Sequence, residues 1–364
     1  MKPFIPPLLP PKFSYELLIK DIGEARDALG ELRGLLTHVK NHALLTAPLL
    51  TKEAVTSSSI EGTQATLEEV YRYEAEQKTS QISEKDKDIR EIINYRWAMQ
   101  TAVSEMKVRP IGENLLKKIH SILLNSVRGA NKDRGNIRRI QVHIGVPGRP
   151  VEEARYIPPP PQVISSLLHN WENYIHSKME KDPVVEIGVA HYQFEAIHPF
   201  TDGNGRIGRL LIPLQLYQKG ILPYPVLYTS QYFERHKKVY YDQLRSVSSD
   251  NDWTGWLQFF LNAVTIQSLE TKKTIIQMIR LYDNLKEKTD DMQSRYAVGV
   301  LDLIFKNPVI SVSTIRKNIG AKSPQTLYNL VDKFIAMKIL QPAGSRKRNQ
   351  IYVFRALLKI VDGI

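Results

Sequence analysis

"HPFTDGNGRIGR", residues 198 to 209, combines one imidazole, one carboxylate, a Gly-Asn-Gly bend and two arginines in a single short stretch. Asp-Gly and Asn-Gly pairs are also typical of hairpin turns between alternating strands, so the flanking residues must decide what the stretch is. Upstream, Asp182 and Pro183 are typical of a helix start, and apolar residues then recur at helical spacing as far as Ile197. The stretch therefore follows a helix rather than a strand.

The residues after the bend predict a second helix. Pro199 disfavours helical backbone angles at His198, so the first helix should end there. Apolar residues then recur every three or four positions from Ile207 to Tyr217, with Pro213 inside the run as a predicted kink. We therefore expect a helix-loop-helix corner.

Such a corner is suited to binding phosphate. The backbone N–H groups of Gly203, Asn204 and Gly205 can turn inward as an anion nest, at the positive end of the new helix. Arg206 and Arg209 lie three positions apart, so they share a helix face and add two cations.

The two remaining ionisable residues extend this chemistry. Asp202 would repel a bare phosphate, but it is a suitable ligand for Mg2+ that bridges two phosphate oxygens. His198, at the end of the first helix, has an ordinary pKa suited to taking a proton near pH 7. Together the residues indicate phosphoryl or nucleotidyl transfer.

The stretch resembles the signature of the Fic (Fic/Doc, or Fido) family, His-x-Phe-x-Asp/Glu-Gly-Asn-Gly-Arg-x-x-Arg, at every fixed position. The resemblance implies a nucleotidyltransferase that moves AMP from ATP to a Ser, Thr or Tyr hydroxyl of a target protein, or of the chain itself, and releases pyrophosphate. It implies that His198 is the general base and Asp202 the Mg2+ ligand. The implied nucleotide-binding residues are Gly203, Asn204, Gly205, Arg206, Ile207, Gly208 and Arg209.

A second segment, "TKEAVTSSSIEGTQATLEEV" (residues 51–70), contains Ser57 and Glu61 on one helix face and Gly62, which can end the helix. Alone, this pattern is common and indicates only a helix end. It also resembles the inhibitory helix of the Fic family, in which Ser or Thr is followed four residues later by Glu and then by Gly or Asn. The resemblance implies that Glu61 forms a bidentate pair with Arg209 and competes there with the terminal phosphate of ATP.

Residues 138–161 alternate between apolar and polar residues, turn at Pro147 and Gly148, and return through Arg155 and Tyr156. The pattern predicts a β-hairpin, and an ordinary surface hairpin is one interpretation. The Fic resemblance instead implies a flap over the active site, at which an extended target segment pairs by strand addition.

Tyr240 is a further candidate. The Fic resemblance implies an aromatic or amide group near the nucleotide at this point of the chain. Core packing on an amphipathic helix explains the residue equally well.

The last hundred residues, 265–364, carry 17 Lys and Arg against 8 Asp and Glu, which is +9 of the formal charge of +12. They predict an amphipathic helix that ends before Pro308, a short helix in "VSTIRKNIG", and a third helix that starts at Ser323 and Pro324. In the third helix, Leu327, Leu330, Phe334 and Met337 are expected to face inward. A hairpin follows with Gly344, Arg346, Lys347 and Arg348 at its tip. The order resembles a winged helix-turn-helix, which implies either DNA contact or a docking or dimer surface.

Composition narrows the remaining possibilities. The 364 residues are 42% hydrophobic and 24% charged, as in ordinary globular proteins, and the absence of Cys excludes disulfides and thiol catalysis. No apolar run reaches membrane-spanning length, and "MKPFIPPLLPPKF" lacks the apolar core of a signal peptide. We therefore expect a cytoplasmic protein with no membrane partner.

These patterns predict a mainly α-helical protein with a Fic-type helical core, a small β-hairpin flap and a C-terminal winged helix-turn-helix domain. The expected limits are 1–109 for an N-terminal helical region that holds the inhibitory helix, 110–264 for the catalytic core and 265–364 for a linker helix and the winged helix. The main hypothesis is an auto-inhibited, Mg2+-dependent protein adenylyltransferase. The alternatives are phosphorylation, UMP transfer or AMP removal at the same site, and a DNA-binding regulator that uses the core as a nucleotide sensor.

Overall fold

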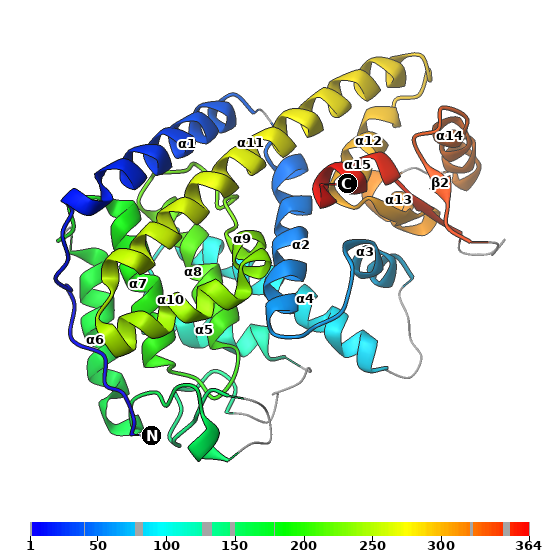
Figure 1. Cartoon of the computed structure of the whole chain (residues 1–364). Helices are drawn as coiled ribbons and strands as arrows, with labels where there is room; N and C mark the ends of the chain where they lie inside the picture. The colour runs from blue at the N-terminus through cyan, green and yellow to red at the C-terminus, as the bar shows by residue number, and fades with distance from the viewer. Residues whose placement is uncertain are drawn as a thin grey trace.

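The computed structural model is mainly helical, with one small sheet (Figure 1). This agrees with the predicted fold class. The residues that it describes are 2–39, 41–76, 83–125, 133–145, 150–177, 179–320, 323–344 and 350–363.

The N-terminal helices follow a short 3-10 turn at Glu16–Leu18. They are α1 (Ile19–Thr37), α2 (Ala43–Ile60), α3 (Leu67–Glu76) and α4 (Glu84–Glu105). α4 starts at a capping box, in which the side chains of Ser83 and Asp86 each bond the backbone N–H of the other residue. α1 runs along α11, and both cross the top of the molecule in Figure 1.

The central helices surround the corner predicted from the sequence. They are α5 (Glu113–Leu123), α6 (Pro161–His176), α7 (Pro183–Ile197), α8 (Asn204–Gln218), α9 (Ser230–Arg235) and α10 (Lys237–Asp250), with a 3-10 turn at Val151–Glu153 between α5 and α6. α7 and α8 pack against each other directly. Residues from both lie in the main hydrophobic core.

Helix α2 lies in the middle of the molecule (Figure 1). It packs against α4 and α9 on one side and α12 on another, and its buried residues are spread around the helix rather than along one stripe. A helix that is buried all round is typical of a protein core. The segment predicted to be inhibitory is therefore an integral part of the fold.

The C-terminal region is joined to the core by one long helix, α11 (Trp253–Asp290). After it come α12 (Ala297–Lys306), β1 (Val309–Ser311), α13 (Val312–Ile319), α14 (Pro324–Ala336), β2 (Gln341–Pro342), β3 (Ile351–Val353) and α15 (Arg355–Asp362). The antiparallel sheet has the order β1-β3-β2, with Ile310 opposite Tyr352 and Pro342 opposite Tyr352. The predicted boundary at 264 lies within α11, and the domain limits stay predictions.

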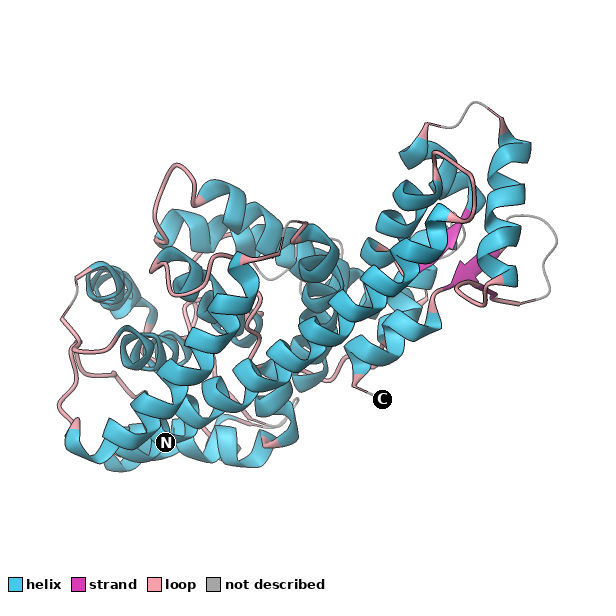
Figure 2. Ribbon diagram, turned by 90° about the horizontal axis from the view of Figure 1, so that it is seen from above, coloured by secondary structure: helices cyan, strands magenta, loops and turns pink. Residues whose placement is uncertain are grey.

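The three helices and the hairpin predicted for this region follow one another in the predicted order, as α12, α13, α14 and the pair β2-β3, whereas β1 and α15 were not predicted. Figure 2 shows the region beside the helical core. Leu327, Leu330 and Phe334 are buried as expected. The prediction for Met337 was wrong: its side chain is 38% exposed, because α14 ends at Ala336 and Met337 leaves the helix. The basic tip, Arg346 to Arg348, lies outside the described residues.

The C-terminal region contacts the N-terminal helices through two ion pairs. Lys52 Nζ of α2 lies 2.8 Å from Asp362 Oδ1 of α15, and Arg355 Nη1 lies 3.1 Å from Glu68 Oε2 of α3. α3 also packs against β1 and β3. The central helix α2 is therefore held between the core and the C-terminal region.

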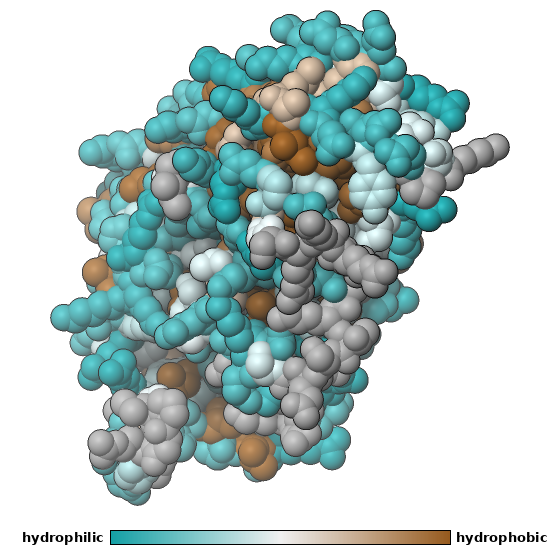
Figure 3. Space-filling view, turned by 90° about the vertical axis from the view of Figure 1, so that its right-hand side faces the viewer, coloured by the Kyte–Doolittle hydropathy of each residue, from teal (hydrophilic) through white to brown (hydrophobic). Residues whose placement is uncertain are grey.

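The side of the molecule on the right of Figure 1 is mostly hydrophilic, with some apolar side chains in its upper part (Figure 3). Among the described residues, the helices that are long enough to cross a bilayer are all too polar to do so.

The contact between α1 and α11 yields a stability prediction. Leu32 is fully buried on the apolar face of α1, whereas Leu17 is 61% exposed. Leu32→Ala removes buried methyl groups and leaves a cavity, so it should lower the free energy of unfolding by about 2–5 kcal/mol. Leu17→Ala should change it by less than about 0.5 kcal/mol. Urea unfolding monitored by circular dichroism checks both values, and equal midpoints for the two variants would contradict the packing.

Candidate active site

The corner between α7 and α8 forms as its sequence predicts. Asp182 caps α7, with its carboxylate accepting the N–H of Val184 at 2.7 Å, and Pro183 is the first helical residue. The helix ends at Ile197, and His198 follows with the left-handed angles φ 49° and ψ 61°. The imidazole therefore lies at the end of the helix, in the loop between the two helices.

The loop is closed by the side chain of Asn204. Its Oδ1 accepts the N–H of Phe200 at 2.9 Å, and its Nδ2 donates to the carbonyl of the same residue at 2.8 Å. Gly203 has φ +78°, which a residue with a Cβ rarely adopts, and directly precedes α8. The Asn204 amide thus shapes the loop, and only its backbone can contribute to the anion nest.

Two buried side chains, His120 and Arg138, donate hydrogen bonds to backbone carbonyl groups of the loop. The Nδ1 atom of His120 accepts the N–H of Gly135 at 2.8 Å, so its Nε2–H donates to the carbonyl of Asp202 at 3.1 Å. Burial lowers the pKa of His120 to about 4, which keeps this ring neutral. Arg138 donates from Nε to the carbonyl of His198 at 2.8 Å.

The candidate base, His198, is held in a neutral form. Burial lowers its pKa to about 4, and the Arg138 charge adds to this effect. Nδ1 lies 3.4 Å from the carbonyl oxygen of Glu195, which can only accept, so this contact favours the proton on Nδ1. The other ring nitrogen, Nε2, then carries the free lone pair that a general base needs. The pKa lies below the value near 7 expected from the sequence, because the ring is buried.

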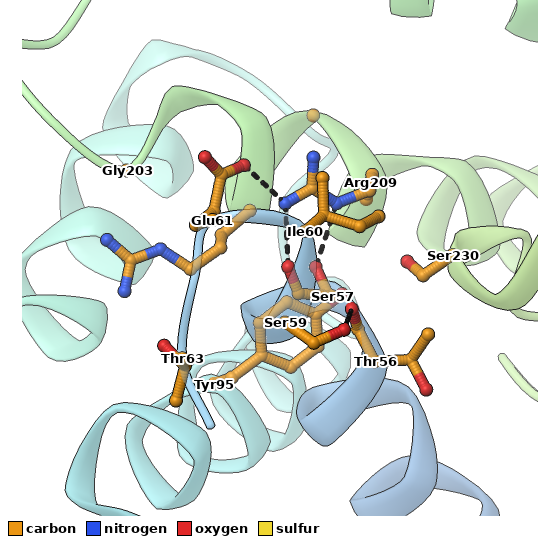
Figure 4. A network of polar contacts seen from close by, with 12 residues as sticks. Thr56, Ser57, Ser59, Ile60, Glu61, Thr63, Tyr95, Gly203, Arg209 and Ser230 are labelled. Atoms are coloured by element: carbon orange, nitrogen blue, oxygen red, sulfur yellow. Dashed lines mark hydrogen bonds and ion pairs between the residues drawn. The ribbon is translucent and has the colours of Figure 1, made fainter. Parts of the chain in front are cut away.

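Arg209 lies at the contact between α8 and α2 and is only 1% exposed. It donates from Nε to the hydroxyl of Ser57 and from Nη2 to the carbonyl of Ser57, both at 2.9 Å. Nη2 also donates to Glu61 Oε1 at 2.7 Å (Figure 4). The structure therefore brings Ser57, Glu61 and Arg209 together.

The pairing of Glu61 differs from the expectation in one respect. Glu61 contacts Arg209 through one oxygen, so the pair is not bidentate. The reason is that Ser57 accepts from the Nε donor of Arg209 and also shares its Nη2 donor with Glu61. Burial alone raises the pKa of Glu61, but the Arg209 charge outweighs it and the pKa lies below its usual value. α2 ends at Ile60, and Gly62 follows with φ +100°.

Gly205 makes room for this ion pair. A Cβ at this position would lie 2.5 Å from Glu61 Oε1 and 2.9 Å from Arg209 Nη1. A side chain at this position would have to displace the ends of the Glu61 and Arg209 side chains, so the glycine leaves room for their contact.

The second arginine of the motif, Arg206, is held between two carboxylates. Its Nη1 lies 3.0 Å from Glu91 Oε2 of α4, and its Nη2 lies 3.4 Å from Asp202 Oδ1. Arg206 and Glu91 are 5% and 7% exposed, whereas Asp202 is 31% exposed. Asp202 is therefore the carboxylate of this group that reaches the surface of the loop.

These donors fit Mg2+ that is shared with a nucleotide. Among the described residues, no three His, Cys, Asp or Glu side chains are grouped as in a metal site built by protein alone. Mg2+ usually keeps several waters and binds one or two carboxylates together with substrate phosphates. Asp202, an accessible carboxylate beside the loop of Gly203 to Gly205, matches that pattern.

The remaining candidates are Tyr240 and the predicted flap. Tyr240 is buried in an aromatic cluster, and its hydroxyl is 2.9 Å from His191 Nε2. In the predicted flap, Ile144 and Tyr156 form a single antiparallel bridge, and the turn at Pro147 and Gly148 lies outside the described residues. Arg155 is exposed, and Tyr156 donates from its hydroxyl to the carbonyl of Ala196 in α7. The proposed target-docking role of Arg155 and Tyr156 stays a prediction.

Several residues around the corner have no motif that could have identified them. They are Glu53, Glu91, His120, Arg138 and Glu195. All five are single polar residues in otherwise ordinary segments, and four come from outside the 198–209 stretch and its preceding helix. For the four that lie in helices, the only sequence signal is a polar residue at a position that helical spacing places on a buried face. Arg138 lies in a loop, where helical spacing gives no signal.

The fold is shared with solved Fic proteins. A Fic family protein from Desulfovibrio desulfuricans G20 is 20% identical, with a TM-score of 0.59 over 95% of this chain and 98% of that one. Fic-1 from C. elegans is 19% identical, with a TM-score of 0.56 over 73% of this chain and 75% of the other.

Residues 110–216 match the model of the Fic/DOC family, and residues 19–104 match that of the Fic/DOC family N-terminal region. The chain belongs to the Fic/DOC family. Over 127 residues it is 36% identical to a protein adenylyltransferase Fic of Aedes aegypti. These residues make up 34% of this chain and 22% of that protein. Over 118 residues it is 33% identical to a probable protein adenylyltransferase of Aquifex aeolicus (strain VF5). These residues make up 32% of this chain and 33% of that protein. The chain thus matches between about a fifth and a third of the length of these two relatives.

The buried carboxyl of Glu53, one turn before Ser57, gives a pH prediction. Its Oε1 accepts from the hydroxyls of Tyr95 and Ser230, and burial raises its pKa to about 7 although these bonds and Arg209 oppose the shift. A carboxyl pKa that is raised on folding gives stability that is complete below pH 4.5 and is lost as the pH rises through 7.

The side chain of residue 53 has no titrating group in the Glu53→Gln variant. Between pH 5 and pH 8, the free energy of unfolding of the parent should therefore fall by about 1–3 kcal/mol relative to that of the variant. Urea unfolding at both pH values measures the change. Glu24→Gln, at an exposed position on α1, is the control and should follow the parent at both pH values. A constant difference between parent and Glu53→Gln would show that the folded-state pKa is not raised.

Proposed function

We propose that this chain is an auto-inhibited protein adenylyltransferase, which transfers AMP from ATP to a hydroxyl of a target protein or of itself. The observation that carries the proposal is the occupation of Arg209, a motif arginine, by Glu61 and Ser57 of α2. The relatives named protein adenylyltransferase support the choice of AMP as the transferred group.

In the proposed reaction the oxygen of the target hydroxyl attacks the α-phosphorus of ATP. The bond from that phosphorus to the oxygen bridging to the β-phosphate breaks, and pyrophosphate leaves. His198 takes the hydroxyl proton on Nε2, for which a neutral imidazole is required. The backbone of Gly203, Asn204 and Gly205, at the start of α8, binds phosphate oxygens.

Arg206 and Asp202 complete the phosphate site in this proposal. Asp202 would hold Mg2+, which when bound neutralises charge on the phosphate oxygens. Arg209 would contact the terminal phosphate, and in the present structure its donors are directed to Ser57 and Glu61 instead. Two anions therefore compete for one cation, and the proposed inhibition is this competition.

Two alternatives share the same site. A regulator that only senses nucleotide needs no general base, so the neutral His198 at the loop favours transfer. Removal of AMP would use the same residues with water as the acceptor, and in that case Glu61 would position the water.

Replacement of His198 tests the base. His198→Ala should reduce AMP transfer by about a hundred- to ten-thousand-fold, because it removes the proton acceptor. ATP binding should stay close to that of the parent, since the phosphates are held by other groups. Incorporation of label from ATP labelled at the α-phosphate measures transfer, and calorimetry measures binding. His169→Ala, at an exposed position on α6, is the matched control. Undiminished transfer by His198→Ala would exclude this role, and label that arrives only from the γ-phosphate would indicate a kinase.

Replacement of Glu61 tests the inhibition. Glu61→Gly removes the anion that competes for Arg209, so self-modification should rise by about a hundredfold, the order of the rate lost when reacting groups are misplaced. The control Glu24→Gln removes an exposed carboxylate on α1 and should leave transfer at the parent level. Adding Arg209→Ala to Glu61→Gly should abolish the gain, since the released arginine does the positioning. If Glu61→Gly lowers the rate, a catalytic role of Glu61 in AMP removal becomes the better explanation.

A further inference from the structure

Residues 2–11 form an extended segment, the N-terminal strap, which runs along the side of the core next to α6 (Figure 1). Half of its residues are proline, which favours an extended backbone and removes N–H groups that would otherwise need partners. A proline-rich segment has little conformational freedom to lose when it docks, so a few contacts are enough to hold it. The strap is therefore a stiff element that can hold another part of the fold in place.

Two helices of the core anchor the strap. Asn170 of α6 accepts the N–H of Leu9 on Oδ1 at 2.8 Å and donates from Nδ2 to the carbonyl of the same residue at 3.2 Å. Gln193 of α7, which is fully buried, donates from Nε2 to the carbonyl of Pro7 at 2.9 Å. The strap is thus fixed to α7, the helix that His198 directly follows.

Near its start the strap contacts the predicted flap. The N–H of Phe4 donates to the carbonyl of Ile157 at 2.9 Å, and the Phe4 ring lies 6.0 Å from the Tyr156 ring at an angle of 55°. Tilted aromatic pairs at this separation are favourable. Tyr156 is also the residue that pairs with Ile144 in the flap. Phe4 therefore packs against the flap at the point where its two chains meet.

Tyr156 links this contact to the candidate base. Its hydroxyl donates to the carbonyl of Ala196 at 2.8 Å, and Ala196 lies just before the end of α7 and His198. Other side chains bond the carbonyls of Pro158 and Pro159, at the base of the flap. Beyond that base, Tyr156 is held between the strap on one side and the end of α7 on the other.

We propose that Phe4 is a positioning residue, which holds Tyr156 and the flap beside the end of α7, so that a target segment paired with the flap brings its hydroxyl to His198. The inference rests on the proposed function, because that function gives the hydroxyl proton to His198, and on the flap as the place where the target docks. Phe4 acts through Tyr156 rather than on the reacting atoms. It adds a residue of the N-terminal region to the placement of the acceptor.

The first measurement is self-modification by the whole chain with ATP labelled at the α-phosphate. Glu61→Gly serves as the background, so that Glu61 does not compete with the phosphates. Phe4→Ala removes the ring but keeps the N–H that bonds Ile157. It should lower the rate at saturating ATP by about tenfold to a hundredfold, because small displacements of a reacting group are costly. The KM for ATP should stay at the value of the background, since the phosphate-binding residues are unchanged.

The second measurement is hydrogen exchange of the flap, followed by mass spectrometry in the same variants. The N–H groups of Ile144, Arg155 and Tyr156 donate to carbonyls within the flap. If Phe4 holds the flap, these groups should exchange faster in Phe4→Ala. Peptides from α7 should keep the exchange rates of the background.

Further variants separate positioning from folding. Leu8→Ala changes a strap residue that is 63% exposed and should leave transfer and exchange unchanged. Phe4→Tyr keeps the ring and should retain both, and Phe4→Leu replaces Phe4→Ala if that variant is unstable. Tyr156→Phe already breaks the bond to Ala196, so adding Phe4→Ala to it should cost less than in the background.

The outcomes distinguish this inference from the proposed function. A folded Phe4→Ala variant that self-modifies at the rate of the background overturns the role of Phe4 and leaves the proposed function standing. A lower rate without faster exchange in the flap also overturns it, as does an equal loss in Leu8→Ala, because the effect would then not pass through the contact with Tyr156. If the Glu61→Gly background transfers no label from the α-phosphate, the proposed function itself fails.

Discussion

The site depends on one interaction, the burial of the Arg209 guanidinium between α8 and α2. A charge that is 1% exposed must be satisfied within the protein, and Ser57 and Glu61 supply the acceptors. Ser57 lies in the last turn of α2 and Glu61 directly follows the helix, so the end of α2 lies against α8. Gly205 leaves room for the pair of Glu61 and Arg209, because it has no side chain of its own at this contact.

Burial around the corner also sets the protonation states of its residues. It keeps the imidazoles of His198 and His120 neutral, and it raises the pKa of the carboxyl groups of Glu53 and Glu195 to about 7. The same removal of water strengthens the ion pair of Arg206 with Glu91 relative to an exposed pair. The neutral imidazoles and the fixed cations therefore have one common cause, which is the low polarity of the interior.

The central position of α2 connects the site to the C-terminal region. The C-terminal end of α2 contacts Arg209, while Lys52, earlier on the same helix, pairs with Asp362 of α15. α3 follows α2 and pairs through Glu68 with Arg355 at the start of α15. The helix that occupies the motif arginine thus packs between two parts of the chain.

The sequence by itself determined the local geometry of the corner. The cap at Asp182, the break at Pro199 and the bend at Gly203 act over a few residues, so they could be identified without any tertiary contact. The end of α2 before Gly62 is a local property of the same kind. Only the tertiary structure decided which partners these elements meet. Glu91 reaches Arg206 across 115 positions of the chain, and the hydroxyl of Tyr240 bonds to His191 in the core. Contacts of this kind depend on how helices pack, and packing is set by the complementary shapes of distant surfaces, which no short stretch of sequence contains.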